Sequence, residues 1–328
     1  MEQSPDQLDV AVAIVSYRTA DMVAEALPPL LEELRAFARA RVVIVDNDSP
    51  GEDADRMQAH LDAMGSPPEV RLVRSPRNGG FAAGNNVAFE TLRADSAPPP
   101  DAVLLLNPDA VMKPGALQEM ARVMAGGPRI GVVGARLENE DGSTWVAAFH
   151  FPSAMGEFAR HLGIGAVQAR WPVLARDMAA PGPVDWVSGA AMLVRWEMIE
   201  DIGGMDEAYF LYFEEIDYMR AAANAGWATW HAPAALVGHA AGGSTGIVDG
   251  APKAGRMPGY WFESWSRYFI KNHGAGYARL AAALKLAGIA LGWTQRRLRG
   301  RQAGLTPHFL SDFAKRCLIG GDGKGTAR

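Results

Sequence analysis

Apolar runs of strand length alternate with segments of helical spacing through the first third of the chain. The runs that predict strands are Val10–Tyr17, Arg41–Val45, Val70–Val73 and Ala102–Leu106. Apolar positions recur at helical spacing across Met22–Ala38, and Asn85–Arg93 has a helical pattern as well. Strands this apolar, separated by helices, are typical of a doubly wound, mostly parallel sheet that is buried on both faces. We therefore predict an α/β fold that begins with a nucleotide-binding half.

The pattern weakens from Asn139 to Pro183 and then resumes. An apolar segment begins at Trp186, and a helix is expected within Phe210–Ala225. Tyr260–Arg301 has a helical pattern that is aromatic early and basic late.

We predict three parts along the chain. These are a nucleotide-binding half over 8–135, an acceptor half over 136–250 that completes a catalytic domain spanning 1–250, and a helical, basic C-terminal extension over 251–328. Charge supports the last division, since the net charge of −5 conceals a segment from Lys253 onward with 14 Lys and Arg residues against three acidic residues. A basic segment of this kind favours an anionic partner.

Apolar and basic residues follow one another in this extension. Leu280, Leu284, Ala287 and Leu291 lie at near-helical spacing, and Arg296, Arg297, Arg299 and Arg301 come next. An apolar face that ends in a basic cluster suits peripheral contact with an anionic membrane. The alternative is that the face packs on protein and the arginines face water. The stretch is too short to cross a bilayer, which takes about 20 apolar residues.

Cysteine content and the start of the chain bear on the compartment. Cys317 is the only cysteine, which excludes an internal disulfide and favours a reducing environment. Met1–Asp9 is polar and acidic, unlike the basic and then apolar start of a signal peptide. We expect a cytoplasmic protein that contacts the inner face of the cell membrane peripherally and has no nucleic-acid partner.

Polar residues follow three of the predicted strands. They are Ser16, Tyr17, Asp46, Asn47, Asp48, Asn107, Pro108 and Asp109. Because ligands of doubly wound sheets bind at the carboxyl ends of the strands, these residues are expected at one edge of the sheet. The residues assigned here to donor binding are Ser16, Tyr17, Asp46, Asn47, Asn107 and Asp109.

Two of the carboxylates suggest specific contacts. Asp46 could accept a hydrogen bond from the N3–H of a pyrimidine base or from ribose hydroxyls, although Asp and Asn are also common in turns. Asp109 could hold a divalent cation that screens a diphosphate, with Asn107 facing the ribose or a metal-bound water. The alternative for this tripeptide is a capped turn that contains Pro108.

A Gly-rich loop over Arg77–Asn86 opens onto a predicted helix. Backbone N–H groups at such a helix start can approach a phosphate, so Gly80 and Asn85 join the donor residues. The loop lacks the Gly-Lys-Ser/Thr of a Walker loop and the spacing of Gly-x-Gly-x-x-Gly. An ordinary tight loop is the alternative.

Glu214, Glu215 and Asp217 form an acidic cluster beside aromatic residues. An apolar environment raises the pKa of a carboxyl group toward the working range of a general base. Alternatively, these acids favour the N-terminus of a helix. His239 follows another apolar run and is either a metal ligand or phosphate donor, or a structural histidine.

The ordered set of these motifs resembles glycosyltransferase family 2, and within it the rhamnosyltransferase-like branch. The matching segments are Val15–Tyr17, Val43–Asn47, Asn78–Asn86, Leu105–Asp109, Ser188–Ala190, Gly203–Glu207, Phe213–Asp217 and His239. They extend over roughly two thirds of the chain.

The resemblance implies a GT-A fold, a divalent metal such as Mg²⁺ or Mn²⁺, and inversion at the anomeric carbon. It implies that Asp46 holds the base, that Asp109 binds the metal and that His239 supports the metal or the diphosphate. The acidic motif supplies the base that deprotonates the acceptor hydroxyl. Glu215 stands at that position, one methylene longer than the usual aspartate, and Glu214 and Asp217 are alternatives.

The resemblance also implies the partners. A dTDP- or UDP-linked sugar, with rhamnose first, is the expected donor, and a glycan or lipid-linked glycan is the expected acceptor. Gly189 and Ala190 belong to a matching segment and are assigned to acceptor binding. Trp186 is assigned with them, although an aromatic residue at such a place is also common in a core.

Other functions share parts of this pattern. A dehydrogenase would need Gly-x-Gly-x-x-Gly after the first strand, where Ser16–Ala20 stands instead. A sugar-nucleotide nucleotidyltransferase would have a basic Gly-rich loop at the same place, which is also absent. A non-catalytic nucleotide- or glycan-binding module is a further alternative, because Glu215 replaces the usual base.

Overall fold

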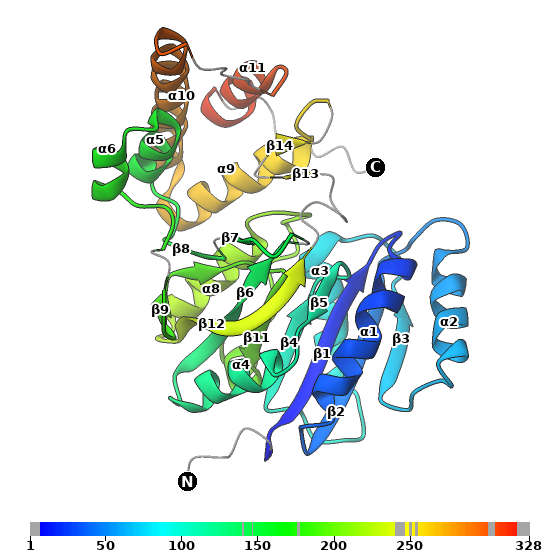
Figure 1. Ribbon diagram of the computed structural model, residues 1–328. Helices are drawn as coiled ribbons and strands as arrows, with labels where there is room; N and C mark the ends of the chain where they lie inside the picture. Colours follow the sequence, from blue (N-terminus) through cyan, green and yellow to red (C-terminus); the bar gives the residue numbers. More distant parts are fainter. Residues whose placement is uncertain are drawn as a thin grey trace. The chain divides into compact units, whose positions relative to one another are not determined.

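The computed structural model divides into two compact units (Figure 1). It describes residues 7–139, 141–145, 147–175, 178–239, 247–248, 251–252, 255–300 and 306–319. Unit 1 comprises Met1–Phe149, Arg176–Phe210 and Glu214–Thr245, and unit 2 comprises His150–Ala175, Leu211–Phe213 and Gly246–Arg328.

One large sheet forms the centre of unit 1, with the strand order β3-β2-β1-β4-β11-β6-β12-β5 (Figure 1). Its strands are β1 (Asp9–Ser16), β2 (Arg39–Asp46), β3 (Val70–Arg74), β4 (Ala102–Leu106), β5 (Ala110–Met112), β6 (Ile130–Glu138), β11 (Ala191–Arg195) and β12 (Ala228–His239). The short strands β7 (Thr144–Trp145) and β9 (Gly182–Val184) pair with β6 and β12, and β8 (Ala148–Phe149) pairs with β10 (Trp186–Val187).

The first four strands of the sheet order are parallel to one another. The later strands add antiparallel pairs, because β11 runs antiparallel to both β4 and β6, and β12 runs antiparallel to β5. The predicted doubly wound start is therefore confirmed, and the whole sheet is mixed.

Six helices complete the described part of unit 1. They are α1 (Ala20–Leu34), α2 (Asp53–Ala63), α3 (Gly80–Arg93), α4 (Ala116–Ala125), α7 (Trp196–Ile202) and α8 (Glu214–Asn224). Helix α3 begins at Gly80, five residues before the predicted start. Helix α2 was not predicted, because it buries little more than Ala54, Met57 and Leu61 and its apolar stripe is thin.

Both faces of β1 are buried, which explains its unbroken apolar run. Val10, Val12 and Ile14 belong to the core cluster that also contains residues of α1. On the other face, a Cβ at Gly84 of α3 would lie 2.5 Å from a methyl carbon of Val15. Helix α3 therefore lies close against β1, and only a glycine permits this approach.

Unit 2 is mainly helical in its described part. Its elements are α5 (Ala154–Leu162), α6 (Gly165–Arg170), α9 (Gly259–His273), α10 (Ala275–Leu298), α11 (Phe309–Phe313), the π-helix η2 (Ala314–Leu318) and the strand pair β13 (Ile247–Val248) and β14 (Ala251–Pro252). The helical segment predicted over Tyr260–Arg301 is two helices, since Gly274 adopts φ +84° between them.

Helix α10 packs on α5 through small residues. A Cβ at Gly288 would lie 2.6 Å from the Phe158 carbonyl oxygen, and one at Gly292 would lie 2.2 Å from the His161 carbonyl oxygen. Two larger apolar residues of this helix lie on the surface, with Leu280 51% exposed and Leu291 54% exposed, whereas Ile289 is buried. No helix in the described part of the chain has the length and apolar content that crossing a membrane requires.

Candidate active site

The carboxyl ends of β1 and β2 lie side by side. Ser16 is aligned with Asp46 in the parallel register, and Asn47 donates its backbone N–H to the Ser16 carbonyl at 2.8 Å. All three residues are buried, and the Ser16 hydroxyl is hydrogen-bonded to that of Thr19 at 2.9 Å. Three of the predicted donor residues are thus brought together at one edge of the sheet.

The loop after β2 is a turn that starts at Asp46. Its Oδ2 atom accepts a hydrogen bond from the backbone N–H of Ser49 at 3.2 Å, and Asp48 adopts φ +59°. Tyr17, after β1, is 39% exposed, with the Arg18 guanidinium carbon 5.3 Å from its ring centre. A hollow of about 510 Å³ lies beside these loops and is lined by Arg18, Pro50, Glu52, Asp53 and Arg56.

The Gly-rich loop is fixed by contacts within unit 1. Asn47 donates from Nδ2 to Asn78 Oδ1 and to the Gly80 carbonyl, both at 3.0 Å. Gly80 adopts φ +82°, and a Cβ there would lie 1.7 Å from the Phe210 carbonyl oxygen. The first two N–H groups of α3 are also used inside the protein, since Gly80 donates to Asn78 Oδ1 and Phe81 donates to the Phe210 carbonyl. The tight-loop alternative accounts for this glycine, and a phosphate contact stays a prediction.

The two asparagines that follow have different roles in α3. Asn85 is fully buried and donates from Nδ2 to the Phe81 carbonyl within the helix at 2.9 Å. Asn86 forms two hydrogen bonds with the backbone of Met205, one to its carbonyl and one from its N–H, at 2.9 and 2.8 Å. The Gly-rich motif and the Gly203–Glu207 motif therefore contact each other, which sequence reasoning did not predict.

Asp109 and His239 meet at the same edge. Strand β12 aligns His239 with Ala110 of β5, so the histidine lies beside the residue that precedes β5. His239 Nε2 is 3.3 Å from Asp109 Oδ1, and both side chains are buried.

This pair fits one side of a divalent metal site. A carboxylate oxygen and an imidazole nitrogen are ligands that Mn²⁺ accepts, and Mg²⁺ prefers oxygen. The described residues contain no cluster of three or more His, Cys, Asp or Glu side chains suited to a metal. The pair therefore fits an ion that takes its other ligands from a bound diphosphate and water.

The motif Ser188–Ala190 adjoins Asn107. Strand β11 runs antiparallel to β4 with Ala191 opposite Leu106, so the entry to one strand lies beside the exit from the other. Asn107 donates its backbone N–H to the Ala190 carbonyl at 2.9 Å. The predicted donor and acceptor segments thus share one edge of the sheet.

Gly189 borders Glu215. A Cβ built on Gly189 would lie 3.6 Å from Cβ of Glu215 and 3.8 Å from a ring carbon of Phe81. Phe81 was not among the predicted site residues, and no local sequence signal links it to residues more than 100 positions away. Trp186 stacks on Phe149, with 4.1 Å between ring centres and 16° between planes.

The three acids lie in the first turn of α8, as the helix-terminus alternative requires. Glu214 and Asp217 are three residues apart on one face of the helix, and both are buried. Glu215 is half-buried and lies on a different side, against Gly189. Of the three, Glu215 is the acid that borders the predicted acceptor segment.

Burial changes the acidity of the two glutamates. It raises the pKa of Glu215 from 4.5 to about 7. Burial first, and the charge of Glu215 second, raise the pKa of Glu214 well above its ordinary value. A helix N-terminus favours the charged form, so desolvation outweighs the macrodipole here. The Oε2 atom of each glutamate is shielded from solvent and has no hydrogen-bond partner among the described residues.

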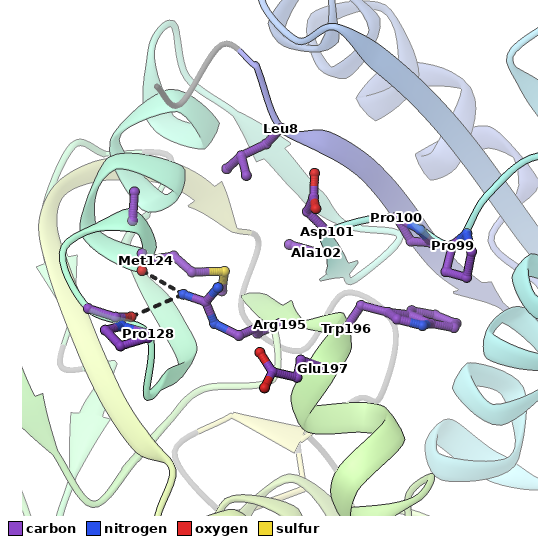
Figure 2. A pocket seen from close by; sticks show the side chains of 12 residues that line it. Leu8, Pro99, Pro100, Asp101, Ala102, Met124, Pro128, Arg195, Trp196 and Glu197 are labelled. Carbon is purple, nitrogen blue, oxygen red and sulfur yellow. Dashed lines mark hydrogen bonds between the residues drawn. The ribbon is translucent and has the colours of Figure 1, made fainter. Parts of the chain in front are cut away.

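A cavity of about 570 Å³ lies at the opposite ends of the same strands (Figure 2). It is bordered by Ala102 at the start of β4 and by Arg195 at the end of β11. Figure 2 shows Arg195 directed toward backbone carbonyls, and it donates from Nη2 to those of Met124 and Gly127 at 2.7 and 3.1 Å. None of the predicted site residues lines this cavity. Its arginine, Arg195, forms hydrogen bonds with backbone carbonyls at the C-terminal end of α4.

Comparison with known families and proteins agrees with this geometry. The family described as glycosyltransferase-like family 2 matches residues 5–250. An N-acetylglucosaminyl-diphospho-decaprenol L-rhamnosyltransferase of Mycobacterium tuberculosis is 31% identical over 189 residues, which cover 55% of this chain and 61% of that protein. A low-salt glycan biosynthesis hexosyltransferase, Agl10 of Haloferax volcanii, is 24% identical over 64% of this chain and 60% of its own length. The matches thus cover about three fifths of each relative.

Solved structures share the fold. GalNAc-T7 with UDP, GalNAc and Mn²⁺ aligns with a TM-score of 0.56 and 13% identity over 94% of this chain and 56% of its own. The mannosyltransferase PcManGT of Pyrobaculum calidifontis, in complex with GDP-Man and Mn²⁺, aligns with a TM-score of 0.53 and 16% identity, over 97% of this chain and 90% of its own. The predicted GT-A arrangement, a sheet flanked by helices, is confirmed.

Proposed function

The chain belongs to glycosyltransferase-like family 2, and we propose that it transfers a sugar from a nucleoside diphosphate to a hydroxyl group of a glycan. One observation carries the proposal. The Asp109–His239 pair and the contact between Gly189 and Glu215 lie at the same edge of the sheet. Between them, the backbone N–H of Asn107 donates a hydrogen bond to the Ala190 carbonyl. The residues proposed for the diphosphate and for the base would therefore be neighbours, as a transfer reaction requires.

The transfer proceeds as one displacement with inversion. The carboxylate of Glu215 removes the proton from the acceptor hydroxyl, and the acceptor oxygen forms a bond to the anomeric carbon. The bond from that carbon to the diphosphate oxygen breaks, and the diphosphate leaves with the electron pair. Glu214 and Asp217 are the alternatives for the base, and Glu215 is favoured because its side chain borders Gly189.

Asp109 and His239 would hold a divalent cation, and the similar structures that contain Mn²⁺ support this role. Bound there, the ion would screen the charge of the diphosphate and stabilise it as a leaving group. The protein would supply one ligand from the end of β12 and one from the turn directly before its partner strand β5, so both would be held in place before the donor arrives.

Ser16, Tyr17, Asp46 and Asn47 would bind the nucleoside, with Gly80 and Asn85 in the loop and helix that support them. The carboxylate of Asp46 would accept a hydrogen bond from the N3–H of uracil or thymine. Guanine does not present an N–H donor at the same place. A UDP- or dTDP-linked sugar is therefore the proposed donor. The mycobacterial relative is named an L-rhamnosyltransferase, and this supports rhamnose as the sugar.

The acceptor would lie against Gly189, Ala190 and Trp186. Its proposed class is a glycan or lipid-linked glycan, since that relative is named for a decaprenol-linked substrate. A lipid-linked acceptor is presented at a membrane surface. Peripheral membrane contact through the basic C-terminal segment is therefore part of the proposal, and the outward face of α10 supports it.

Two measurements on the whole chain test the function. The first is isothermal calorimetry with UDP, dTDP and GDP, each with and without Mn²⁺. The second is release of nucleoside diphosphate from dTDP-rhamnose and UDP-sugars, with and without glycan acceptors. We expect metal-dependent binding of UDP or dTDP and acceptor-stimulated release. Tight GDP binding without UDP or dTDP binding would refute the proposed donor, and binding without any release would indicate a non-catalytic module.

A further inference from the structure

A short segment that follows α7 in unit 1, residues 203–205, is held by side chains from two other helices of the same unit. From α3, Asn86 donates from Nδ2 to the Met205 carbonyl at 2.9 Å and accepts the Met205 N–H on Oδ1 at 2.8 Å. From α8, the hydroxyl of Tyr218 donates to the Gly203 carbonyl at 3.0 Å. The segment therefore links α3 to α8, and the proposed function gives it no role.

The Asn86 amide uses both its nitrogen and its oxygen in this region. Its Nδ2 atom also donates to Glu207 Oε1 at 3.0 Å, and Glu207 forms an ion pair with Arg77 at 2.7 Å. A Cβ at Gly204 would lie 2.4 Å from Asn86 Oδ1, so a glycine is needed for the amide to reach the backbone. Because the two donated bonds and the accepted bond come from one planar group, the amide has a single orientation.

Tyr218 makes its contact from a buried position on α8. It is 4% exposed, so water competes little with the Gly203 carbonyl as its partner. Tyr218 comes three residues after Glu215, and residues at this spacing lie on the same face of a helix. The hydrogen bond from Tyr218 therefore holds the face of α8 that carries Glu215, about one turn further along the helix.

The same two helices meet at Gly189. A Cβ built there would lie 3.6 Å from Glu215 Cβ and 3.8 Å from a ring carbon of Phe81, the second residue of α3. The sheet sets the position of α3, because Gly84 allows this helix to lie close against β1. The link from α3 through residues 203–205 to α8 thus connects Glu215 to a fixed part of the sheet.

We propose that Asn86 and Tyr218 are positioning residues, which hold the proposed base Glu215 against the acceptor segment. This proposal rests on the proposed function, in which Glu215 deprotonates the acceptor hydroxyl. A base must lie within hydrogen-bond reach of the proton that it removes, and small displacements of a catalytic group lower the rate strongly. The competing explanation is that α8 is held by another contact, from the Val187 N–H to Met219 Sδ at 3.3 Å, and that the two side chains only stabilise the fold.

The test compares Tyr218→Phe and Asn86→Leu with Thr91→Val. Tyr218→Phe removes one oxygen atom, and Asn86→Leu replaces the amide with an apolar group of similar size. Thr91 also donates its hydroxyl to a backbone carbonyl, that of Val87 at 2.7 Å, but both residues belong to α3. The control therefore loses a hydrogen bond of the same kind within one helix. Melting temperatures, measured alongside, report the common effect of a lost hydrogen bond on stability.

The first readout is the division of the effect between kcat and KM. In release of dTDP from dTDP-rhamnose, Tyr218→Phe and Asn86→Leu should lower kcat roughly tenfold or more and change donor KM by less than about twofold. The reason is that the base is displaced while the residues proposed to bind the donor stay in place. Thr91→Val should keep both values.

The second readout is the pH dependence of kcat. Burial raises the pKa of Glu215 to about 7, and Glu214, its titrating neighbour on α8, is present in every variant. A Glu215 displaced toward water ionises at lower pH, so the midpoint should fall in Tyr218→Phe and Asn86→Leu and stay at about 7 in Thr91→Val. Tyr218→Phe and Asn86→Leu that match Thr91→Val in both kcat and midpoint would overturn the positioning role.

The two proposals fail in different ways. Turnover by Glu215→Gln at the wild-type rate would overturn the proposed base, and the positioning role would fall with it. An inactive Glu215→Gln, together with wild-type kcat and midpoint in Tyr218→Phe and Asn86→Leu, would overturn only the positioning role.

Discussion

Asp109 Oδ1 lies 3.3 Å from His239 Nε2, and the antiparallel pairing of β5 with β12 holds the two residues in that relation. Asp109 lies in the turn directly before β5, and His239 is the last residue of β12. Both are buried, so water competes little with a ligand at this point. A bound ion would therefore meet two ligands already in place.

The first prediction concerns this pair. Asp109→Ala should abolish metal-dependent donor binding and lower turnover by roughly a hundredfold or more, because one protein ligand to the cation is lost. Calorimetry of UDP and dTDP with Mn²⁺ and with chelator measures the effect. Asp62→Ala, at an exposed acid on α2, is the control and should behave as wild type. Equal turnover by Asp109→Ala, with and without chelator, contradicts the assignment.

The sequence predicts much of the first half of the fold, for a physical reason. Strands β1 and β4 are buried on both faces, so their residues are apolar without interruption, and a short apolar run identifies them within one or two residues. The topology rule for such sheets then places Asp46 and Asp109 at one edge. The alternation of strands and helices was thus enough to predict which residues lie at that edge.

Other features could not be read from local pattern. The glycine at position 80 is required by the Phe210 carbonyl, and the sequence carries no sign of a contact at that separation. For α10 the pattern left two alternatives open, contact of the apolar face with a membrane or packing on protein. The pattern could not decide between them, because the helix packs on α5 through small residues such as Gly288 and Gly292 and leaves Leu280 and Leu291 exposed.

The second prediction concerns the pH dependence of transfer. Because burial raises the pKa of Glu215 to about 7, its carboxylate form predominates only above that pH. Turnover should rise with pH up to about 7 and level off above it. Glu215→Gln should keep donor affinity, lose roughly a hundredfold or more in turnover and lose this dependence. A near wild-type Glu215→Gln with an inactive Asp217→Asn would instead assign the base to Asp217.

The third prediction concerns stability and the same residue. A carboxyl group whose pKa is raised by folding binds its proton more tightly in the folded state. Its contribution to the free energy of unfolding is then greatest below pH 4.5 and declines as the pH rises to about 7. Glu215→Gln should therefore raise the melting temperature at pH 8 and change it little at pH 4.5. An equal shift at both pH values contradicts this explanation.

The fourth prediction concerns a buried ion pair in unit 2. Lys285 Nζ lies 2.7 Å from Glu157 Oε2, and both side chains are almost fully buried. Lys285→Met should lower the free energy of unfolding by about 3–5 kcal/mol, because the Glu157 charge is left without its partner. Removing both charges, as Lys285→Met with Glu157→Gln, should recover much of the loss. Urea denaturation of the three proteins measures this, and a double variant less stable than Lys285→Met contradicts it.

The last prediction concerns membrane contact. Leu280, Leu291 and Leu298 are 51%, 54% and 84% exposed on α10, and this helix contains no acidic residue. Arg296 and Arg297 lie in its last turn, so apolar and basic groups are presented together. Each basic residue near an anionic surface contributes about 1 kcal/mol, and each buried leucine adds about 1.5–3 kcal/mol.

We expect the chain to co-sediment with phosphatidylserine-containing vesicles at low salt and less at high salt, and not with neutral vesicles. Leu280→Ser with Leu291→Ser should weaken binding at both salt concentrations, whereas Arg296→Gln with Arg297→Gln should weaken it mainly at low salt. Leu174→Ser, which removes an apolar residue that is 49% exposed outside α10, is the control and should bind as wild type. Wild-type binding by both double variants, or no sedimentation with anionic vesicles, would leave α10 without a role at the membrane.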